Sequence, residues 1–273
     1  MIRLLILGPT GSMGKLIAEL ALKDEEIDVV AACDVKAIGN KLQSLITVED
    51  RNELIIEDIN NLQDIIKKTK PDVVVDFTTA KATEKNCMLC VENGVRSVIG
   101  TTALSEEFLK KFEEMIKKHS APAVISPNMA TGVNVLFKMA GILTKYLSDW
   151  DIEIIEAHHH RKQDSPSGTA LKIGKIISDS LGSDFDTISK FGRGKGLNKR
   201  EIGGKNEIGF HAIRAGDIVG DHIILFGGLG ERIELKHQAH SRICFAEGAI
   251  KAIKYIAHVK ESKIYDTNEV LGL

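Results

Sequence analysis

Short apolar runs alternate with amphipathic segments along the first half of the chain. Residues 2–7, 27–33, 72–77, 96–99 and 123–126 have the length and composition of buried parallel strands. Between them, residues 15–22, 59–68, 82–92 and 105–118 carry apolar side chains at helical spacing, while residues 36–57 are less regular. Strands that alternate with helices predict a Rossmann-like, doubly wound parallel sheet of the α/β class over residues 1–128.

The pattern changes after residue 128. Helical spacing predicts helices over residues 133–147 and 170–181, with a strand over residues 151–155 between them. Three strand-like runs follow at residues 207–214, 222–226 and 232–237, with glycine-containing turns between them. The sequence thus predicts an α+β second domain at residues 129–242 with a mainly antiparallel sheet. A last helix at residues 245–259 is expected to return to the first domain, so that residues 243–273 complete it.

Residues 190–206 interrupt the second domain with five glycines and six lysines or arginines. Loops of this kind lie on the surface and often carry function. The composition predicts a mobile basic loop that could act as a lid.

A glycine motif, GPTGSMG, follows the first apolar run and leads into a helix. Gly8, Gly11 and Gly14 suit a tight turn, close approach of the backbone to a pyrophosphate, and close helix–strand packing. Asp34 ends the second strand about 20 positions further on, where an acidic residue commonly binds the adenine ribose. The other reading of Asp34 is an ordinary turn residue. The motif predicts a dinucleotide site.

Residues 156–170 read EAHHHRKQDSPSGTA and lie between an expected strand and an expected helix. Ser165 or Ser167 can cap that helix, and Pro166 is tolerated in a first turn. Gly168 and Thr169 then offer backbone N–H groups at the positive end of the helix dipole, which suits a carboxylate or phosphate. Lys162 and the histidines could face the same point. The stretch predicts an anion-binding site with proton donors beside it.

Two other readings of this stretch remain open. It could be a solvated surface loop, or its histidines could bind a metal ion. On an extended chain His158 and His160 share a face but His159 does not, and no HExxH pattern accompanies them. Cys87 and Cys90 form a CxxC within an expected helix, where we interpret them as small core residues. The sequence therefore predicts no metal site.

Composition narrows the classes of partner. The chain has 273 residues, 43% of them hydrophobic, with 36 basic and 38 acidic side chains and a net charge of −2. This balance gives no case for nucleic acid or an anionic membrane surface as the main partner. No apolar run approaches the roughly 18 residues needed to span a bilayer, and the run at residues 2–7 is too short for a signal peptide. We expect the protein to reside in the cytoplasm.

Four motifs together carry a family resemblance. They are GPTGSMG at residues 8–14, GTT at residues 100–102, EAHHHRKQDSPSGTA at residues 156–170 and IRAGDIVGDH at residues 213–222. The chain resembles the dihydrodipicolinate reductase family, also called 4-hydroxy-tetrahydrodipicolinate reductases, over essentially its whole length. The third motif is the most specific, whereas the glycine motif alone would not discriminate.

The resemblance implies an enzyme that transfers a hydride from NADH or NADPH to a cyclic unsaturated dicarboxylate imine. The reaction converts 4-hydroxy-tetrahydrodipicolinate to tetrahydrodipicolinate in the lysine and diaminopimelate pathway. It also implies a homotetramer formed through the second domain, which binds the substrate.

The same resemblance implies residue roles. His158 would be the general acid and Lys162 a second proton donor. His159 would contact the substrate, and a substrate carboxylate would meet Ser167, Gly168 and Thr169. The implied cofactor-binding residues are Gly8, Pro9, Thr10, Gly11, Ser12, Met13, Gly14, Asp34, Gly100, Thr101, Thr102, Ser126, Pro127, Asn128 and Met129.

The chain departs from the common family pattern in two places. Ser12 stands where many members have a basic residue, and Val35 stands where many have an arginine. Asp34 would repel a 2′-phosphate, with Lys36 nearby to offset it, so we predict a preference for NADH or use of both cofactors. The competing functions are another amino-acid dehydrogenase such as an aspartate dehydrogenase, a non-catalytic NAD-binding sensor, and a metal hydrolase using residues 158–160.

Overall fold

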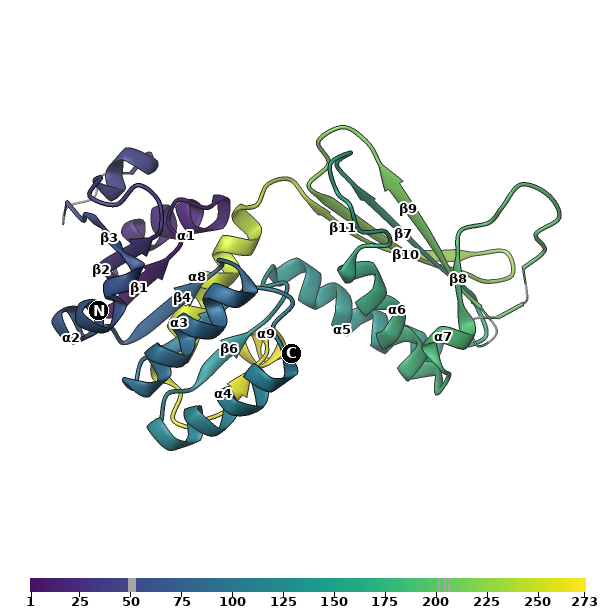
Figure 1. Ribbon diagram of the computed structural model, residues 1–273. Coiled ribbons are helices and arrows are strands. Elements are labelled where there is room, and N and C mark those ends of the chain that lie inside the picture. Colours follow the sequence, from purple (N-terminus) through teal and green to yellow (C-terminus); the bar gives the residue numbers. More distant parts are fainter. Residues whose placement is uncertain (49–52, 201, 204, 206) are drawn as a thin grey trace. The chain divides into compact units, whose positions relative to one another are not determined.

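The computed structural model describes residues 1–48, 53–200, 202–203, 205 and 207–273. The chain forms two compact units (Figure 1). Unit 1 comprises Met1–Thr131 and Arg242–Leu273, and unit 2 comprises Gly132–Ser241. Within the described residues, no helix is both long enough and apolar enough to cross a membrane.

Unit 1 is built on a seven-stranded sheet in the order β12-β6-β5-β4-β1-β2-β3, and all its pairings are parallel. The strands are β1 (Ile2–Leu7), β2 (Ile27–Asp34), β3 (Ile56–Asp58), β4 (Val73–Asp76), β5 (Arg96–Ile99), β6 (Ala123–Ile125) and β12 (Ile264–Tyr265). Strands β2 and β3 follow β1 on one side, whereas β4 lies on its other side. The strand order therefore reverses between β1 and β4, which is where ligands of such sheets bind.

Helices cover both faces of this sheet, which explains why β1 is apolar at nearly every position. Leu4 and Ile6 pack in a core with α1 (Ser12–Lys23) and α8 (Ile243–His258). Leu5 and Leu7 pack on the opposite face with α2 (Leu62–Thr69) and α3 (Ala80–Glu92). The remaining helical segments of unit 1 are η1 (Leu42–Leu45), η2 (Ile59–Asn61), α4 (Glu106–His119) and α9 (Thr267–Leu271).

The cysteines of α3 are core residues, as the sequence predicted. Cys87 and Cys90 are fully buried, and burial raises the pKa of both thiols. Such thiols are packing groups rather than nucleophiles or metal ligands.

Unit 2 contains α5 (Thr131–Tyr146), α6 (Gly168–Leu181), α7 (Phe185–Ile188) and a five-stranded sheet in the order β11-β10-β7-β9-β8. The strands are β7 (Asp151–His158), β8 (Ser189–Phe191), β9 (Ile208–Arg214), β10 (Gly220–Gly227) and β11 (Arg232–Ala239). Helix α6 packs on one face, where Gly174 leaves room for the ring of Phe210.

The sheet of unit 2 is mixed, which corrects the expectation of a mainly antiparallel sheet. β10 pairs antiparallel with β11 and β7, whereas β9 pairs parallel with β7 and β8. The physical reason is the connection after β7. The chain passes through α6 and α7 before it re-enters the sheet, and a long helical crossover returns a strand in its original direction.

The basic segment expected to be a mobile loop is partly tied down. Its first residues form β8. The guanidinium groups of Arg193 and Arg200 pair with Glu153 on β7 and with Glu207, which directly precedes β9. Residues 201, 204 and 206 of the segment lie outside the described residues. The ion pairs do not favour a freely moving lid in the described part of the segment.

Candidate functional site

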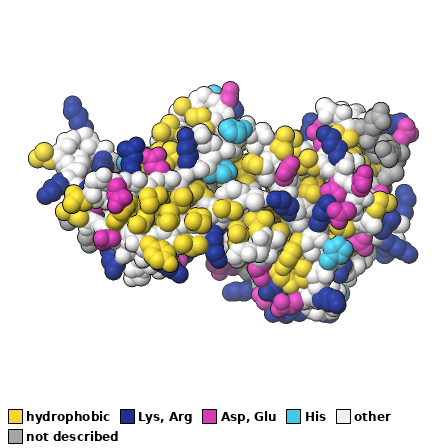
Figure 2. Space-filling view, turned by 180° about the vertical axis from the view of Figure 1, so that it is seen from behind, with side chains coloured by type: hydrophobic (Ala, Val, Ile, Leu, Met, Phe, Trp, Pro, Cys, Tyr) yellow, Lys and Arg dark blue, Asp and Glu magenta, His cyan; other side chains and the backbone are white. Residues whose placement is uncertain are grey.

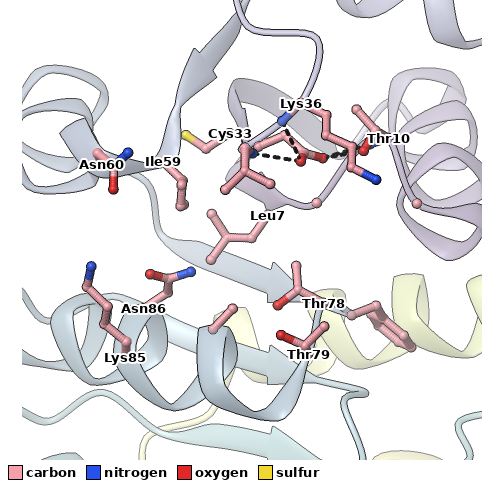
Figure 3. A pocket seen from close by; sticks show the side chains of 16 residues that line it. Leu7, Thr10, Cys33, Lys36, Ile59, Asn60, Thr78, Thr79, Lys85 and Asn86 are labelled. Atoms are coloured by element: carbon pink, nitrogen blue, oxygen red, sulfur yellow. Dashed lines mark hydrogen bonds between the residues drawn. The ribbon is translucent and has the colours of Figure 1, made fainter.

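A groove of about 520 Å³ lies at the strand-order reversal of unit 1 (Figure 3). Its walls come from residues at the carboxyl ends of β1, β2 and β4. Thr10 and Lys36 lie on one side of the groove, and Thr78, Thr79 and Lys85 lie on the other (Figure 3). The groove is thus at the edge where a doubly wound sheet binds its ligand.

Glycines shape the turn after β1. A Cβ atom at Gly14 would lie 2.1 Å from the carbonyl oxygen of Gly8, so only glycine lets α1 start this close to the turn. Gly8 has a φ of +75°, and a Cβ there would lie 2.6 Å from Thr78 Cγ2. Its N–H donates to the Cys33 carbonyl, which joins the turn to β2. The geometry fits the close backbone approach that a pyrophosphate needs.

Asp34 binds the glycine turn directly. Its Oδ2 accepts hydrogen bonds from the Thr10 N–H at 3.0 Å and the Thr10 hydroxyl at 2.7 Å. Its Oδ1 accepts from the backbone N–H groups of Val35 and Lys36 (Figure 3). A carboxylate offers about four lone-pair sites. The chain itself therefore supplies a full set of donors to Asp34, whose negative charge stays at the rim of the groove.

The other expected cofactor residues take different positions. Gly8, Thr10, Gly11 and Asp34 line the groove. Pro9 and Met129 are buried, and Met13 packs against the core. Gly100 leaves room for the Phe77 ring, and the Ser126 hydroxyl donates to the Asn128 carbonyl. The remaining expected residues are Ser12, Gly14, Thr101, Thr102 and Pro127, which do not line this groove.

A buried carboxylate that sequence reasoning missed holds the turn after β4. Asp76 Oδ1 accepts hydrogen bonds from the N–H and hydroxyl of Thr78 and from the hydroxyl of Thr83. Burial raises the pKa of Asp76, and these hydrogen bonds act in the opposite direction. Because Thr78 lines the groove, Asp76 shapes its wall. In the sequence, the available signal for Asp76 was its position at the end of a strand predicted to be buried.

In unit 2, the end of β7 and the start of α6 meet at Glu156. The His158 ring is nearly buried, and its Nδ1 lies 2.5 Å from Glu156 Oε2. Glu156 Oε1 accepts from the Ser167 N–H at 3.0 Å. A glycine at position 220 leaves space beside His158 Nε2, since a Cβ there would lie 3.1 Å from that atom.

Arg214 completes this cluster from β9. Its two terminal nitrogens each donate to a different oxygen of Glu156 at 2.9 Å. Burial of Glu156, which is 1% exposed, favours a raised pKa. Hydrogen bonds from Arg214, His158 and the Ser167 N–H outweigh that effect and lower the pKa of Glu156. The carboxylate is therefore ionised where it holds the histidine.

Ser167 is the cap of α6. Its hydroxyl accepts a hydrogen bond from the Ala170 N–H at 3.2 Å and lies 3.1 Å from His222 Nε2. A side chain at Gly168 would meet nothing within 4 Å, so the backbone of the first turn is accessible. The first N–H groups of a helix have no intrahelical acceptor. This turn therefore has the arrangement of an anion site.

The loop between β7 and α6 is fixed by the β9–β10 connection. The His159 N–H donates to the Ile218 carbonyl, and the Lys162 N–H donates to the His159 carbonyl. Lys162 Nζ lies 2.8 Å from Asp164 Oδ1, and this hydrogen bond lowers the pKa of Asp164. The histidine stretch and the IRAGDIVGDH stretch are thus neighbours in space, although about 50 residues separate them.

Glu156, Arg214 and His222 were missed as site residues. Glu156 had a usable signal, because residues two apart on a strand share a face and His158 was already singled out. The other two reach the cluster through strand pairing, with Arg214 opposite His158 and His222 opposite Glu156. Among the residues that the structure describes, no group of three or more His, Cys, Asp or Glu is arranged to hold a metal ion.

Unit 1 has a glycine turn at the switch point of a parallel sheet, and unit 2 has a histidine–lysine loop followed by the start of a helix. These features are typical of a two-domain nicotinamide-dependent oxidoreductase. Family comparison agrees. The dihydrodipicolinate reductase N-terminus matches residues 2–129, and the C-terminus of that family matches residues 132–271. The chain belongs to the dihydrodipicolinate reductase family, whose members are pyridine-nucleotide-dependent reductases of lysine and diaminopimelate biosynthesis.

Similar proteins span the whole chain. A 4-hydroxy-tetrahydrodipicolinate reductase of Methanosarcina acetivorans is 45% identical and covers 100% of both chains. The enzyme of that name from Methanocaldococcus jannaschii is 44% identical over 100% of this chain and 98% of its own.

Solved structures agree with the family. A dipicolinate-bound dihydrodipicolinate reductase from Paenisporosarcina sp. TG-14 has a TM-score of 0.79 and 31% identity, with 98% of each chain covered. An amine dehydrogenase from Mycobacterium smegmatis, at a TM-score of 0.59 and 15% identity over 98% of this chain and 95% of its own, shares the fold alone. The fold class and the family resemblance inferred from the sequence are confirmed.

Proposed function

We propose that this chain reduces 4-hydroxy-tetrahydrodipicolinate, a cyclic dicarboxylate, to tetrahydrodipicolinate, with the 4-hydroxyl group leaving as water. The observation that carries the proposal is the shared carboxylate of Glu156, which holds both His158 and the start of α6. A proton donor and an anion-binding turn are thereby kept side by side. The relative from Paenisporosarcina carries dipicolinate, a planar dicarboxylate, in its solved structure. That ligand supports a substrate of the same chemical class here.

The substrate carboxylate would bind at the start of α6. The backbone N–H groups of Gly168 and Thr169 would donate to it, with the helix dipole adding to the attraction. Ser167, whose hydroxyl is buried as the cap, would contribute by shaping this turn. His159 would contact the substrate from the preceding loop.

The protein's chemical task is to deliver a proton. A bound reduced nicotinamide would supply the hydride, which leaves electron density on the substrate. His158 would donate a proton from Nε2, because its Nδ1 is held by Glu156. Lys162 would act as a second donor, and the dianionic substrate would favour the charged forms of both side chains.

The dinucleotide would bind in the groove of unit 1. Gly8, Thr10, Gly11 and Asp34 would contact it there. The other expected contacts are Pro9, Ser12, Met13, Gly14, Gly100, Thr101, Thr102, Ser126, Pro127, Asn128 and Met129, of which the buried members would act through the backbone or by shaping the turns. Gly8 and Gly11 line the groove without side chains, which supports a cofactor that approaches the backbone there.

For cofactor preference, we propose NADH or the use of both cofactors. The charge of Asp34 at the groove rim disfavours a 2′-phosphate. The Lys36 and Lys85 side chains line the same groove and offset part of that charge. Hydrogen bonds from Thr10 and from the backbone of Val35 and Lys36 already occupy the Asp34 oxygens. The side chains of Lys36 and Lys85 are therefore the groups that can adjust to a 2′-phosphate.

The assay is substrate-dependent oxidation of NADH and of NADPH, followed by the absorbance of the reduced nicotinamide. Enzymatically generated 4-hydroxy-tetrahydrodipicolinate serves as the substrate. Rapid oxidation that requires this substrate is the expected result. A folded protein that binds NADH but oxidises neither cofactor would contradict the proposal and favour a sensor. Reduction of NAD⁺ by aspartate would favour an aspartate dehydrogenase.

We also propose a homotetramer formed through the exposed face of the unit 2 sheet. Along β10, buried residues alternate with the half-buried Ile223 and Leu225, which face away from α6. Ile155 and Ile213 lie on the same face of neighbouring strands. Hydrophobic side chains gather over this unit in Figure 2, on the left of the view. Glu153, which pairs with His211, lies on the same face opposite Leu225. Apolar side chains gathered on a sheet face are typical of an interface between subunits.

A further inference from the structure

One carboxylate ties together three elements of unit 2. Glu156 lies on β7 and is 1% exposed. Its Oε2 lies 2.5 Å from His158 Nδ1 and 2.9 Å from one Arg214 nitrogen. Its Oε1 lies 2.9 Å from the second Arg214 nitrogen and 3.0 Å from the Ser167 N–H. Removing this carboxylate would take the acceptor from the Ser167 N–H and from His158 Nδ1, and it would take the counter-charge from Arg214.

We propose that Glu156 is a positioning residue that keeps His158 in its proton-donating state and holds the anion-binding turn in register with it. The inference rests on the proposed reductase function, in which His158 is the general acid. Glu156 itself touches neither substrate nor cofactor in this assignment. It acts through His158 and through the N–H of Ser167.

The Glu156 carboxylate determines the tautomer of His158. A carboxylate at Nδ1 accepts a hydrogen bond, so Nδ1 keeps its hydrogen in both protonation states. The proton that comes and goes is therefore on Nε2, next to the space left by Gly220. If the ring were flipped, Nε2 would face Glu156 and Nδ1 would face the substrate. The proton would then be delivered from a different position.

Glu156 also balances the charge around His158. The charged or titratable groups that face His158 are Glu156 on its own strand, Arg214 on β9 and His222 on β10, whose ring centroid lies 5.3 Å away. Burial lowers the pKa of His222 to about 4, so this ring is neutral near pH 7. Arg214 alone would repel a proton on His158. The Glu156 carboxylate, whose Oε2 lies 2.5 Å from His158 Nδ1, offsets that repulsion.

The same strand offers a matched control. Glu153 lies three residues earlier and faces the opposite side of the sheet. It pairs with His211 at 2.6 Å, with Arg193 at 2.7 Å and with Arg200. Both carboxylates thus bind arginine and histidine, but Glu153 has no contact with the His158 cluster. A change at Glu153 tests the general cost of losing such a carboxylate.

The test compares Glu156→Gln, Arg214→Gln and Glu153→Gln in the pH dependence of turnover at saturating substrate and cofactor. In Glu156→Gln the alkaline limb should move to lower pH by about one unit, because Arg214 then faces His158 without a counter-charge. In Arg214→Gln it should move to higher pH, because Glu156 then acts on His158 alone. Glu153→Gln should leave the alkaline limb of the profile at the wild-type pH. Shifts in the same direction for the first two variants, or no shift in either, would overturn the inference.

A readout without turnover keeps the two proposals separable. Nitrogen-15 spectra of labelled histidine, with the His158 signal assigned from His158→Asn, report the tautomer and the titration of that ring. The wild-type ring should carry hydrogen on Nδ1 when neutral, and its titration should shift in opposite directions in Glu156→Gln and Arg214→Gln. If the wild type fails to oxidise NADH or NADPH with substrate, the function is wrong, and the spectra still decide the role of Glu156. A neutral ring protonated on Nε2 would refute that role.

Discussion

The Ser167 hydroxyl lies 3.1 Å from Nε2 of His222 and joins the start of α6 to β10. The Ala170 N–H donates to the same hydroxyl, which caps the helix. The pKa of His222 is lowered, first by burial and second by the nearby His158. The ring beside the helix cap is therefore neutral near pH 7.

His222 should make the fold sensitive to mild acid. Its pKa falls from 6.5 to about 4 on folding. As pH drops from 6.5 towards 4, the unfolded chain gains a proton that the folded chain does not, so the stability falls by about 3 kcal/mol across this window. His222→Asn should be less stable than the wild type at pH 7. On acidification, however, its melting temperature should fall by less than that of the wild type. The control is His240→Asn, an exposed histidine; equal acid sensitivity of wild type and His222→Asn would contradict the argument.

Lys162→Ala should lower turnover strongly, by about 100-fold or more if it acts as a proton donor. NADH affinity should stay nearly unchanged, because the groove assigned to the cofactor lies in unit 1. Steady-state kinetics and NADH fluorescence titration measure the two effects. Gln163→Ala, at the exposed neighbouring position, is the control and should retain turnover. An equal loss of NADH binding and turnover would remove Lys162 from the substrate side.

Gly14→Ala should weaken NADH binding at least tenfold and lower the melting temperature. The added methyl group would lie 2.1 Å from the Gly8 carbonyl oxygen, so the turn or helix α1 must shift. Calorimetric titration with NADH and thermal unfolding measure both effects. Gly194→Ala, where a Cβ meets nothing within 4 Å, should change neither. Unaltered NADH affinity in Gly14→Ala would argue against the glycine turn as the pyrophosphate site.

Lys36→Ala and Lys85→Ala should raise the KM for NADPH several-fold more than the KM for NADH. Both lysines line the groove and would contact the 2′-phosphate that NADH lacks. Lys81→Ala provides the control, since Lys81 is an exposed lysine of the same helix α3 outside the groove lining. Steady-state kinetics with NADH and with NADPH measure the ratio of the two KM values in each variant. Equal effects on both cofactors would place the lysines elsewhere on the nucleotide, and a wild-type preference for NADPH would contradict our proposal.

Leu225→Glu should dissociate the proposed tetramer, because it replaces an apolar side chain of the proposed interface with a second carboxylate opposite Glu153. Light scattering coupled to size-exclusion chromatography measures the mass. The control is Leu229→Glu in the β10–β11 turn, where the leucine is fully exposed and off the sheet face. Leu229→Glu should assemble as the wild type does. A tetramer that survives Leu225→Glu, or a monomeric wild type, would reject this interface.

Local patterns predicted most elements because the physics there is local. The continuous apolar run at residues 2–7 predicted a strand covered on both faces, and β1 is covered by α1 and α8 on one side and by α2 and α3 on the other. Ser165 or Ser167 was expected to cap the helix behind the histidine stretch, and the Ser167 side chain accepts a backbone hydrogen bond there. β3, β8 and β12 were not predicted, since strands of two or three residues carry too little periodicity.

The sequence by itself determined the doubly wound sheet, the glycine turn, the capped helix behind the histidine loop and the family. These follow from spacing within short segments. Only the tertiary structure decided that Arg214 and His222 join Glu156, because strand register brings together residues that lie far apart in the chain. It also decided that half the pairings of the second sheet are parallel. Pairing between distant strands depends on how the helices between them pack, and that packing has no local signature in the sequence.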